Sequence, residues 1–325
     1  MILNIEGNIN RYYVETLCLV FFPGATFGEG EVAGVGVPEV SVRIYTDIDC
    51  SITAYVTMKL NDKICEVHET VSHDELIHIA TPEHLAVGRA LFACGKEMLG
   101  HIPPWGILTG IRPAKIAGNL LNSVGGVNKA KKILRDEYFL SHQKSALAVN
   151  VAVAEDKIIK KLDPMSCSLY ISIPFCPSRC SYCSFVSYTT PRLLSMIDEY
   201  IDALISDLKD TAALINELNM HVTTVYIGGG TPTTLSAKQL TVLLNSVQNY
   251  FDLSKVVEYT LEAGRPDTIT LEKLQIAKKF GVTRVSVNPQ TLSDEVLRDI
   301  GRKHTALDFF NAYELARQSG IREMH

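Results

Sequence analysis

The sequence predicts an α/β protein in which a small α+β domain precedes a parallel sheet with covering helices. The chain has 325 residues, more than the roughly 250–300 at which a single hydrophobic core usually stops growing. The pattern also changes along the chain, from mixed strands and helices to a regular alternation of the two. We therefore expect two domains, an N-terminal α+β accessory domain at residues 1–163 and a second domain at 164–325.

The first 60 residues are predicted to be extended, because the runs 40–46 and 51–60 alternate apolar and polar side chains. Asn61 and Asp62 then predict a hairpin turn into a further strand.

Helical periodicity follows, first in a helix from Pro82 to about Gly100. The run Pro-Pro-Trp-Gly at 103–106 interrupts this pattern. Its Trp105, together with Arg112, is predicted to lie on a substrate-facing surface, on an inter-domain surface or in the core of a folded loop. The remaining helices of this half are expected near residues 113–122, 127–138 and 142–162.

Four strand–helix units are predicted from residue 168 onward, which favours a parallel sheet. Their strands are expected at 169–173, 224–227, 258–262 and 284–287, and their helices at 192–218, 236–250, 270–280, 293–300 and 305–319. A fifth strand is expected to begin within 321–325. Because a half-built sheet would expose its last strand edge, we expect the native protein to continue beyond residue 325, so that this domain is truncated at its C-terminus.

The composition and charge of the chain argue against several classes of function. The formal net charge of −5 gives no general basic surface for nucleic acid. The first fifteen residues lack the basic and apolar regions of a signal peptide. No apolar run approaches the roughly 18 residues of a membrane span. We expect a cytoplasmic protein without nucleic-acid partners and without a membrane span.

Three of the eight cysteines are clustered, Cys176, Cys180 and Cys183, directly after the first strand of the second half. Ligands of parallel α/β sheets bind beyond the carboxyl ends of the strands. Three thiolates can hold three irons of a cubane and leave the fourth iron open to a small molecule. The alternatives are coincidental buried cysteines or a structural zinc site, which normally needs four ligands. The isolated cysteines are interpreted as structural, namely Cys18, Cys50, Cys65, Cys94 and Cys167.

The spacing C-x3-C-x2-C, with Tyr182 before the last cysteine, resembles the signature of the radical S-adenosylmethionine (SAM) superfamily. The resemblance implies a partial (β/α) barrel with a [4Fe-4S] cluster on Cys176, Cys180 and Cys183. It also implies that the open iron binds the amino and carboxylate groups of SAM. Electron transfer then splits SAM into methionine and a 5′-deoxyadenosyl radical.

The run Tyr-Ile-Ser-Ile-Pro-Phe-Cys at 170–176 resembles the oxygen-independent coproporphyrinogen III oxidase group, and residues 104–113 resemble its HemZ (coproporphyrinogen dehydrogenase) branch. The resemblance implies oxidative decarboxylation of propionates of coproporphyrinogen III to vinyl groups in haem biosynthesis. An electron donor such as flavodoxin or ferredoxin would be a partner. Two departures are Ser172, where relatives carry histidine, and the lack of a fourth cysteine soon after Cys183. The alternatives are a haem-binding chaperone of the same group and a non-enzymatic metal-stabilised module.

Further residues at the predicted strand ends match SAM-binding positions of that group. The glycine run at 228–230 lets backbone approach a ligand closely, and with Thr231 it resembles the family's Gly-Gly-Gly-Thr-Pro-Thr segment. Each position also has an ordinary interpretation, as a strand-to-helix turn, a charged strand end, a surface side chain or barrel packing. The resemblance implies that SAM contacts Tyr170, Gly229, Gly230, Thr231, Glu262, Gln290 and Arg302.

Overall fold

The computed structural model describes residues 1–28, 36–73, 81–109 and 112–325. Within them the chain forms two compact units, Met1–Lys161 (the first unit) and Leu162–His325 (the second unit). Each unit has its own sheet and its own buried core. Among the described residues, no helix combines the length and apolar character needed to cross a membrane.

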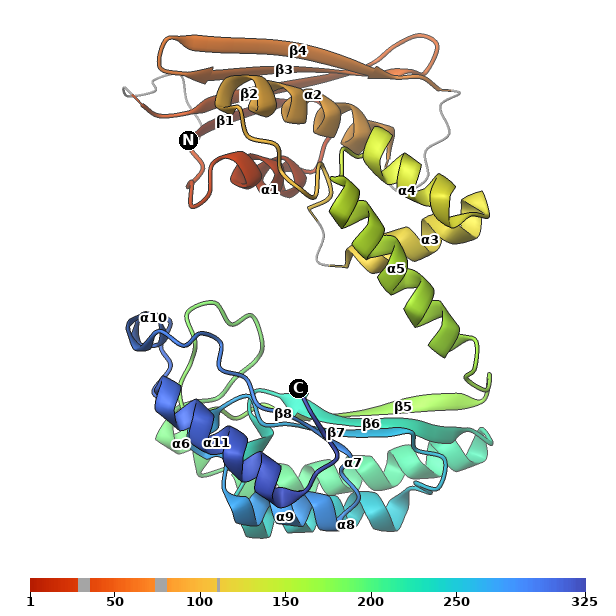
Figure 1. Cartoon of the computed structure of the whole chain (residues 1–325), viewed down its shortest axis with the longest axis vertical. Helices are drawn as coiled ribbons and strands as arrows, with labels where there is room; N and C mark the ends of the chain where they lie inside the picture. The colour runs from red at the N-terminus through yellow and green to blue at the C-terminus, as the bar shows by residue number, and fades with distance from the viewer. Residues whose placement is uncertain (29–35, 74–80, 110–111) are drawn as a thin grey trace. The chain divides into compact units, whose positions relative to one another are not determined.

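The first unit contains a four-stranded sheet of order β1-β2-β3-β4 (Figure 1). The first two strands are parallel, and the other neighbours are antiparallel. The predicted hairpin is confirmed, because Leu60 pairs with Lys63 and Asn61 takes the positive φ of a tight turn, 52°. The strands are β1 (Ile2–Glu6), β2 (Glu39–Thr46), β3 (Ile52–Leu60) and β4 (Lys63–Val71).

The prediction of extended structure throughout residues 1–60 is wrong at α1 (Arg11–Phe21), which is a helix. Asn10 starts it by accepting a hydrogen bond from the Tyr12 N–H at 2.9 Å. Burial along one helical stripe outweighs the strand preference of the aromatic and β-branched residues in this segment. Positions 29–35 of the same stretch lie outside the described residues. The buried stripe consists of Val14, Leu17, Cys18 and Phe21.

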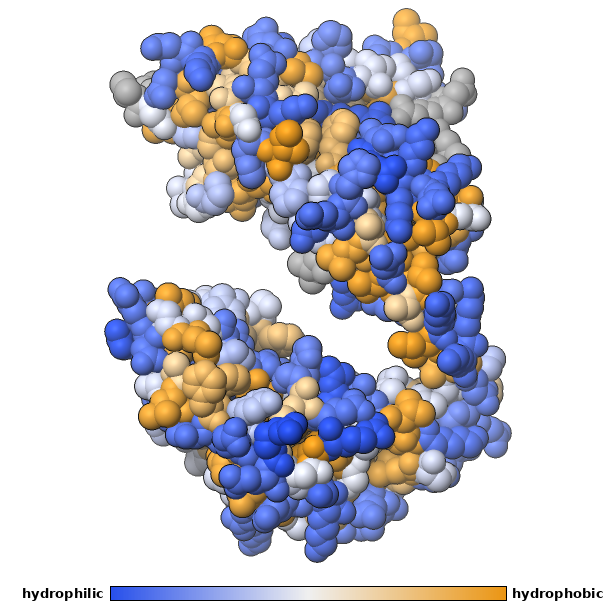
Figure 2. Space-filling view, viewed as in Figure 1, coloured by the Kyte–Doolittle hydropathy of each residue, from blue (hydrophilic) through white to orange (hydrophobic). Residues whose placement is uncertain are grey.

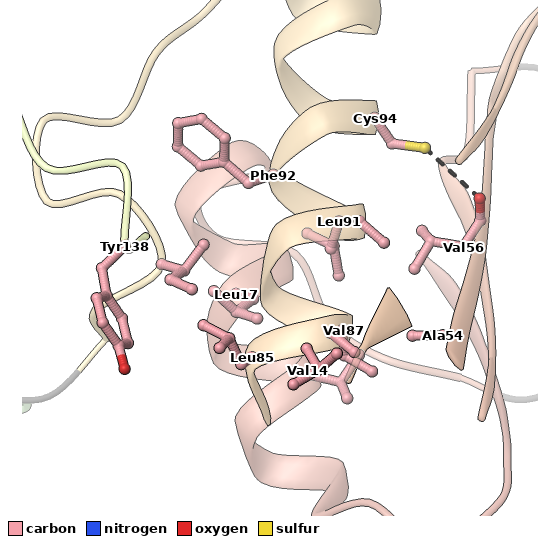
Figure 3. Close-up of a cluster of buried hydrophobic side chains, with 14 of the residues drawn as sticks. Val14, Leu17, Ala54, Val56, Leu85, Val87, Leu91, Phe92, Cys94 and Tyr138 are labelled. Carbon is pink, nitrogen blue, oxygen red and sulfur yellow. Dashed lines mark hydrogen bonds between the residues drawn. The ribbon is translucent and has the colours of Figure 1, made fainter. Parts of the chain in front are cut away.

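Helix α2 (Pro82–Leu99) packs on β3 and β4. The Thr81 side chain caps its N-terminus, and Gly100 ends it in a left-handed conformation. Figure 3 shows its apolar side chains beside those of α1 and β3, with the Cys94 thiol 3.6 Å from the Val56 carbonyl. The remaining helices are close to the predicted ranges: α3 (Pro113–Val124), α4 (Val127–Asp136) and α5 (His142–Ile159).

The second unit contains five strands in sequential order, all parallel to their neighbours. This arrangement confirms the predicted α/β class. The last strand lies within the range expected for a fifth strand. The strands are β5 (Ser166–Ile173), β6 (His221–Gly229), β7 (Glu258–Glu262), β8 (Arg284–Ser286) and β9 (Glu323–Met324).

Figure 1 shows α7, α8 and α9 on one face of this sheet. The single helix predicted at 192–218 is divided, because the backbone at Met196 leaves the helical region with ψ of 9°. The short 3-10 helices η1 (Pro232–Thr234) and η2 (Pro266–Thr268) follow β6 and β7. The α-helices are α6 (Pro191–Leu194), α7 (Ile197–Glu217), α8 (Ala237–Tyr250), α9 (Leu271–Lys279), α10 (Asp294–Asp299) and α11 (Ala306–Ser319).

Burial alternates along β5 and separates the two faces of this sheet. Leu169, Ile171 and Ile173 are buried in the core that includes α7 and α8, whereas Tyr170 and Ser172 are exposed. The sheet therefore presents polar and aromatic side chains on the face opposite these helices.

Candidate active site

The clustered cysteines lie in a loop that leaves β5 and returns to its end. Phe175 and Tyr188 form an isolated parallel bridge. The Cys176 N–H donates to the Tyr188 carbonyl at 3.1 Å, and the Tyr188 N–H donates to the Pro174 carbonyl at 2.7 Å. These backbone bonds fix both ends of the loop at the carboxyl edge of the sheet.

The three thiols of this loop are free, with Cys176 and Cys180 buried and Cys183 half-buried. Among the described residues, no group of three or more His, Cys, Asp or Glu side chains is placed to hold one metal ion. A cubane does not require such convergence, because each thiolate binds a different iron. A donor set of three thiolates on one loop therefore fits an iron–sulfur cluster better than a structural zinc ion with its four ligands.

The loop contacts the end of β6 through Thr231, which is 2% exposed. The Thr231 Oγ1 atom lies 3.2 Å from the Cys176 sulfur. Burial raises the pKa of the Cys176 thiol, while the hydrogen bond with Thr231 and the positive charge of Arg265 act in the opposite direction. Bound metal would replace the proton, since the thiolate is the ligand form.

The glycine run makes room for this contact. A Cβ atom on Gly230 would lie 3.0 Å from the Cys176 sulfur and 2.9 Å from the Phe175 carbonyl oxygen. Gly229 has a φ of 105°, which favours glycine. The Gly230 N–H donates to the Ile173 carbonyl at 2.8 Å, so this amide is already used within the protein.

Tyr170, Tyr226 and Glu262 lie on neighbouring strands. The two tyrosine rings stack with centroids 5.7 Å apart. Burial raises the pKa of the Glu262 carboxyl, partly offset by a hydrogen bond with Tyr226 and by the charge of Arg302. The strand ends thus carry a partly desolvated acid beside an aromatic pair.

Arg302 is buried and joins two loops of the site. Its guanidinium donates to the Gly264 carbonyl at 2.6 Å and to the Tyr182 hydroxyl at 3.1 Å. Within the described part of the chain its buried Nε has no hydrogen-bond acceptor. Since buried donors are normally satisfied, this N–H is available to a ligand.

Gln290 follows β8 and is exposed, with a φ of 60°. Non-glycine residues rarely adopt this left-handed region, and such outliers cluster at functional sites. In the described part of the chain, the hydrogen bonds and ring contacts that join the other candidate residues do not include Gln290.

Two buried residues of this region were missed by the sequence reasoning, Arg265 and His304. Arg265 hydrogen-bonds Ser178 and the Cys180 sulfur. The His304 Nε2 atom lies 3.4 Å from the Pro289 carbonyl, and burial lowers the pKa of its ring. The position of Arg265 just beyond the strand expected at 258–262 was the one available signal for it.

Trp105 and Arg112 line a groove between α3 and α5 of the first unit, with a volume of about 770 Å³. Figure 2 shows apolar surface over these helices. The Lys144 ammonium lies 5.0 Å from the centroid of the Trp105 ring. Gly110 and Ile111, which belong to the stretch 104–113 singled out in the sequence, lie outside the described residues.

Comparisons with known proteins match the second unit most extensively. Residues 170–325 match the family model of the radical SAM superfamily. The oxygen-independent coproporphyrinogen-III oxidase-like protein HemZ of Bacillus subtilis is 35% identical over 224 residues, 68% of this chain and 45% of that protein. The heme chaperone HemW of the same organism is 39% identical over 155 residues, 47% of this chain and 40% of that protein. The chain thus spans less than half the length of these two relatives.

Among solved structures, the coproporphyrinogen III oxidase HemN from Escherichia coli matches 48% of this chain and 35% of its own. The sequence identity is 30% and the TM-score is 0.44.

Proposed function

Residues 170–325 are a radical SAM domain, and on this basis we propose that Cys176, Cys180 and Cys183 ligate its [4Fe-4S] cluster. The cofactors of the superfamily are this cluster and SAM, which together supply reductive cleavage of SAM as the start of radical chemistry. The observation that carries the proposal is the loop of three thiols at the carboxyl edge of a parallel sheet, with Thr231 3.2 Å from the Cys176 sulfur.

The chain's own residues would bind and orient SAM beside the thiols. The Glu262 carboxylate would accept hydrogen bonds from the SAM ammonium, and a bound cation would lower the raised pKa of this acid. The free Nε of Arg302 would donate to the SAM carboxylate. The Gln290 amide would bind ribose hydroxyls, while Tyr170 would line the pocket.

The glycine run and Thr231 would border SAM through their backbone. Because the Gly230 N–H is bonded to Ile173, carbonyl oxygens rather than this amide would face the ligand. Gly229 and Gly230 would act mainly by leaving the space that a Cβ atom would fill.

We further propose that the reaction is oxidative decarboxylation of the propionates of coproporphyrinogen III to vinyl groups in haem biosynthesis. Support comes from the similarity to HemZ, which extends over 68% of this chain and therefore beyond the radical SAM domain. A flavodoxin or ferredoxin would deliver the electron. A reducing cytoplasm would keep the eight cysteines as thiols, as they are in the structure.

A second candidate function is that of a haem chaperone, which would keep the cluster without decarboxylating a porphyrinogen. The similarity to HemW favours it, and so does the absence of a fourth cysteine soon after Cys183. The two functions differ in a measurable way, since a chaperone binds haem tightly and forms no vinyl product.

The test uses the full-length protein, reconstituted anaerobically with iron and sulfide. It is given SAM, a reductant and coproporphyrinogen III, and both 5′-deoxyadenosine and vinyl product are quantified. Cys180→Ser should abolish both products. Cys167→Ser is the matched control, because this half-buried thiol lies on β5 outside the cysteine loop.

Formation of both products in the parent and in Cys167→Ser, with loss in Cys180→Ser, supports the decarboxylase. 5′-Deoxyadenosine without vinyl product, combined with tight haem binding, supports the chaperone. A parent protein without a cluster and without 5′-deoxyadenosine contradicts the proposed radical chemistry.

A further inference from the structure

Arg265 is a buried cation that has no carboxylate partner among the residues that the structure describes. Arg265 lies just after the end of β7 in the sequence, and the residue is 3% exposed. None of the ion pairs among the described residues includes it. A buried charge is costly unless an opposite charge or several hydrogen bonds compensate for it. The groups that surround this guanidinium must therefore compensate for its charge.

The guanidinium of Arg265 faces the cysteine loop. Its Nη1 donates to the Ser178 hydroxyl at 3.0 Å, and its Nη2 donates to the Ser178 carbonyl and to the Cys180 sulfur, the latter at 3.3 Å. Ser178 in turn donates from its hydroxyl to the Gly301 carbonyl at 2.9 Å. One planar side chain thus holds the middle of the loop and touches one of its three thiols.

The position of Arg265 is itself fixed by its own backbone. Its carbonyl accepts hydrogen bonds from the Thr268 N–H at 3.0 Å and from the Thr268 hydroxyl at 2.8 Å. The Thr268 hydroxyl also lies 2.6 Å from the Thr233 hydroxyl, at the start of the segment after β6. The guanidinium is therefore presented to the loop from a rigid turn.

Hydrogen bonds to cluster sulfurs and the local charge set the reduction potential of an iron–sulfur centre. Reduction adds one negative charge to the cluster and its thiolates. A buried cation stabilises the reduced state more than the oxidised state, because its attraction grows with that negative charge. A guanidinium also offers several donors in a fixed plane, which a lysine ammonium does not.

We propose that Arg265 is a positioning residue for the cluster: it orients the Cys180 ligand, supplies the countercharge for the bound cluster and raises its reduction potential. The inference rests on the proposed function, since it requires the cluster to be held by the cysteine loop.

The test measures the midpoint potential of the reconstituted cluster in the full-length protein, by anaerobic redox titration followed by electron paramagnetic resonance. Arg265→Met removes the charge and the donors at similar volume. We expect its one-electron reduction to become at least tenfold less favourable, a fall of about 59 mV. Arg265→Lys keeps the charge and loses the planar fork of donors, so its midpoint potential should lie between those of the parent and Arg265→Met.

Two further variants separate the effects. Arg284→Met is the matched control, because Arg284 is a partly buried arginine of the same sheet that pairs with Glu258 at 3.3 Å; its potential should equal that of the parent. Ser178→Ala removes the hydroxyl link and leaves the contact between Arg265 and the Cys180 sulfur. It should keep the potential and release the cluster faster.

Each result of these measurements either supports or overturns the inference. A cluster in Arg265→Met with the parent's potential overturns the inference and leaves the proposed function intact. A parent protein that holds no cluster overturns both. If Arg265→Met is folded by circular dichroism but retains no cluster, the potential of Arg265→Lys decides: a lower value supports the inference, and an unchanged value overturns it.

Discussion

The Thr231 hydroxyl lies 3.2 Å from the Cys176 sulfur, although 55 residues separate them in the sequence. The contact joins the segment after β6 to the loop after β5, so it depends on the parallel pairing of these strands. Thr231 is 2% exposed, which leaves its hydroxyl few partners other than this sulfur.

Thr231→Val should weaken cluster retention. The substitution keeps the shape of the side chain and removes a buried hydrogen bond, which contributes about 1 kcal/mol. We expect the reconstituted cluster to be lost to a chelator several-fold faster, followed by its visible absorbance. Thr231→Ser keeps the hydroxyl and should behave like the parent. Equal rates for Thr231→Val and the parent would show that the contact does not hold the loop.

Gly230→Ala should lower the iron content after reconstitution. The added Cβ atom would lie 2.9 Å from the Phe175 carbonyl oxygen and 3.0 Å from the Cys176 sulfur. Because the Phe175 oxygen is a backbone atom, no side-chain rotation can relieve the clash with it. Gly264→Ala is the control at the same edge of the sheet, since its Cβ atom would meet nothing closer than 3.8 Å. Full iron content in Gly230→Ala would contradict the predicted clash.

Glu262 should make the cofactor-free protein less stable as the pH rises. Burial raises the pKa of this acid above its ordinary value of 4.5, so the folded state binds the proton more strongly than the unfolded state. The stabilising contribution of protonation is complete below pH 4.5 and is lost as the pH rises through the raised value. Glu262→Gln removes this titration.

The measurement is calorimetric unfolding of the parent and of Glu262→Gln from pH 4.5 to 7.5. The unfolding temperature of the variant should rise relative to that of the parent across this range. A difference that stays constant with pH would exclude Glu262 as the titrating group.

Leu91→Ala should destabilise the first unit by about 2–5 kcal/mol, because it leaves a cavity in a close-packed core. Leu91 is 0% exposed. Trp105, the one tryptophan of the chain, lies in this unit, so its fluorescence during urea unfolding reports on this core. Leu147→Ala, at a side chain 47% exposed, should change the free energy of unfolding by less than about 1 kcal/mol. A small effect of Leu91→Ala would contradict the packing shown in Figure 3.

The local sequence was sufficient to predict most elements of the second unit. In β5 the apolar residues Leu169, Ile171 and Ile173 alternate with Tyr170 and Ser172. Helix α8 opens with a capping box formed by Ser236 and Gln239. Both signals act within a few residues. Helix α1 could also have been predicted, because Asn10 precedes the stripe of Val14 and Leu17. The extended prediction for residues 1–60 rested instead on the alternating runs 40–46 and 51–60.

The contacts around the cysteines could not be predicted in this way. Arg265 meets Ser178 across 87 residues and Cys180 across 85, and Arg302 meets Tyr182 across 120. Such contacts follow from the order and register of the strands, which a short stretch of sequence does not determine. The three cysteines could be recognised because they lie within eight residues of sequence, whereas Arg265 can be recognised only when the sheet is assembled.

The hydrogen bond from Ser178 to the Gly301 carbonyl can form only late in the synthesis of the chain. A ribosome reaches Gly301 only after adding 123 residues beyond Ser178, which takes about 6–25 s at roughly 5–20 residues per second. For the first 87 of these residues the loop lacks Arg265 as well as Gly301, so its thiols are open to oxygen and to stray metal ions. A nascent chain stalled before residue 265 should therefore react faster with a thiol reagent than the released protein.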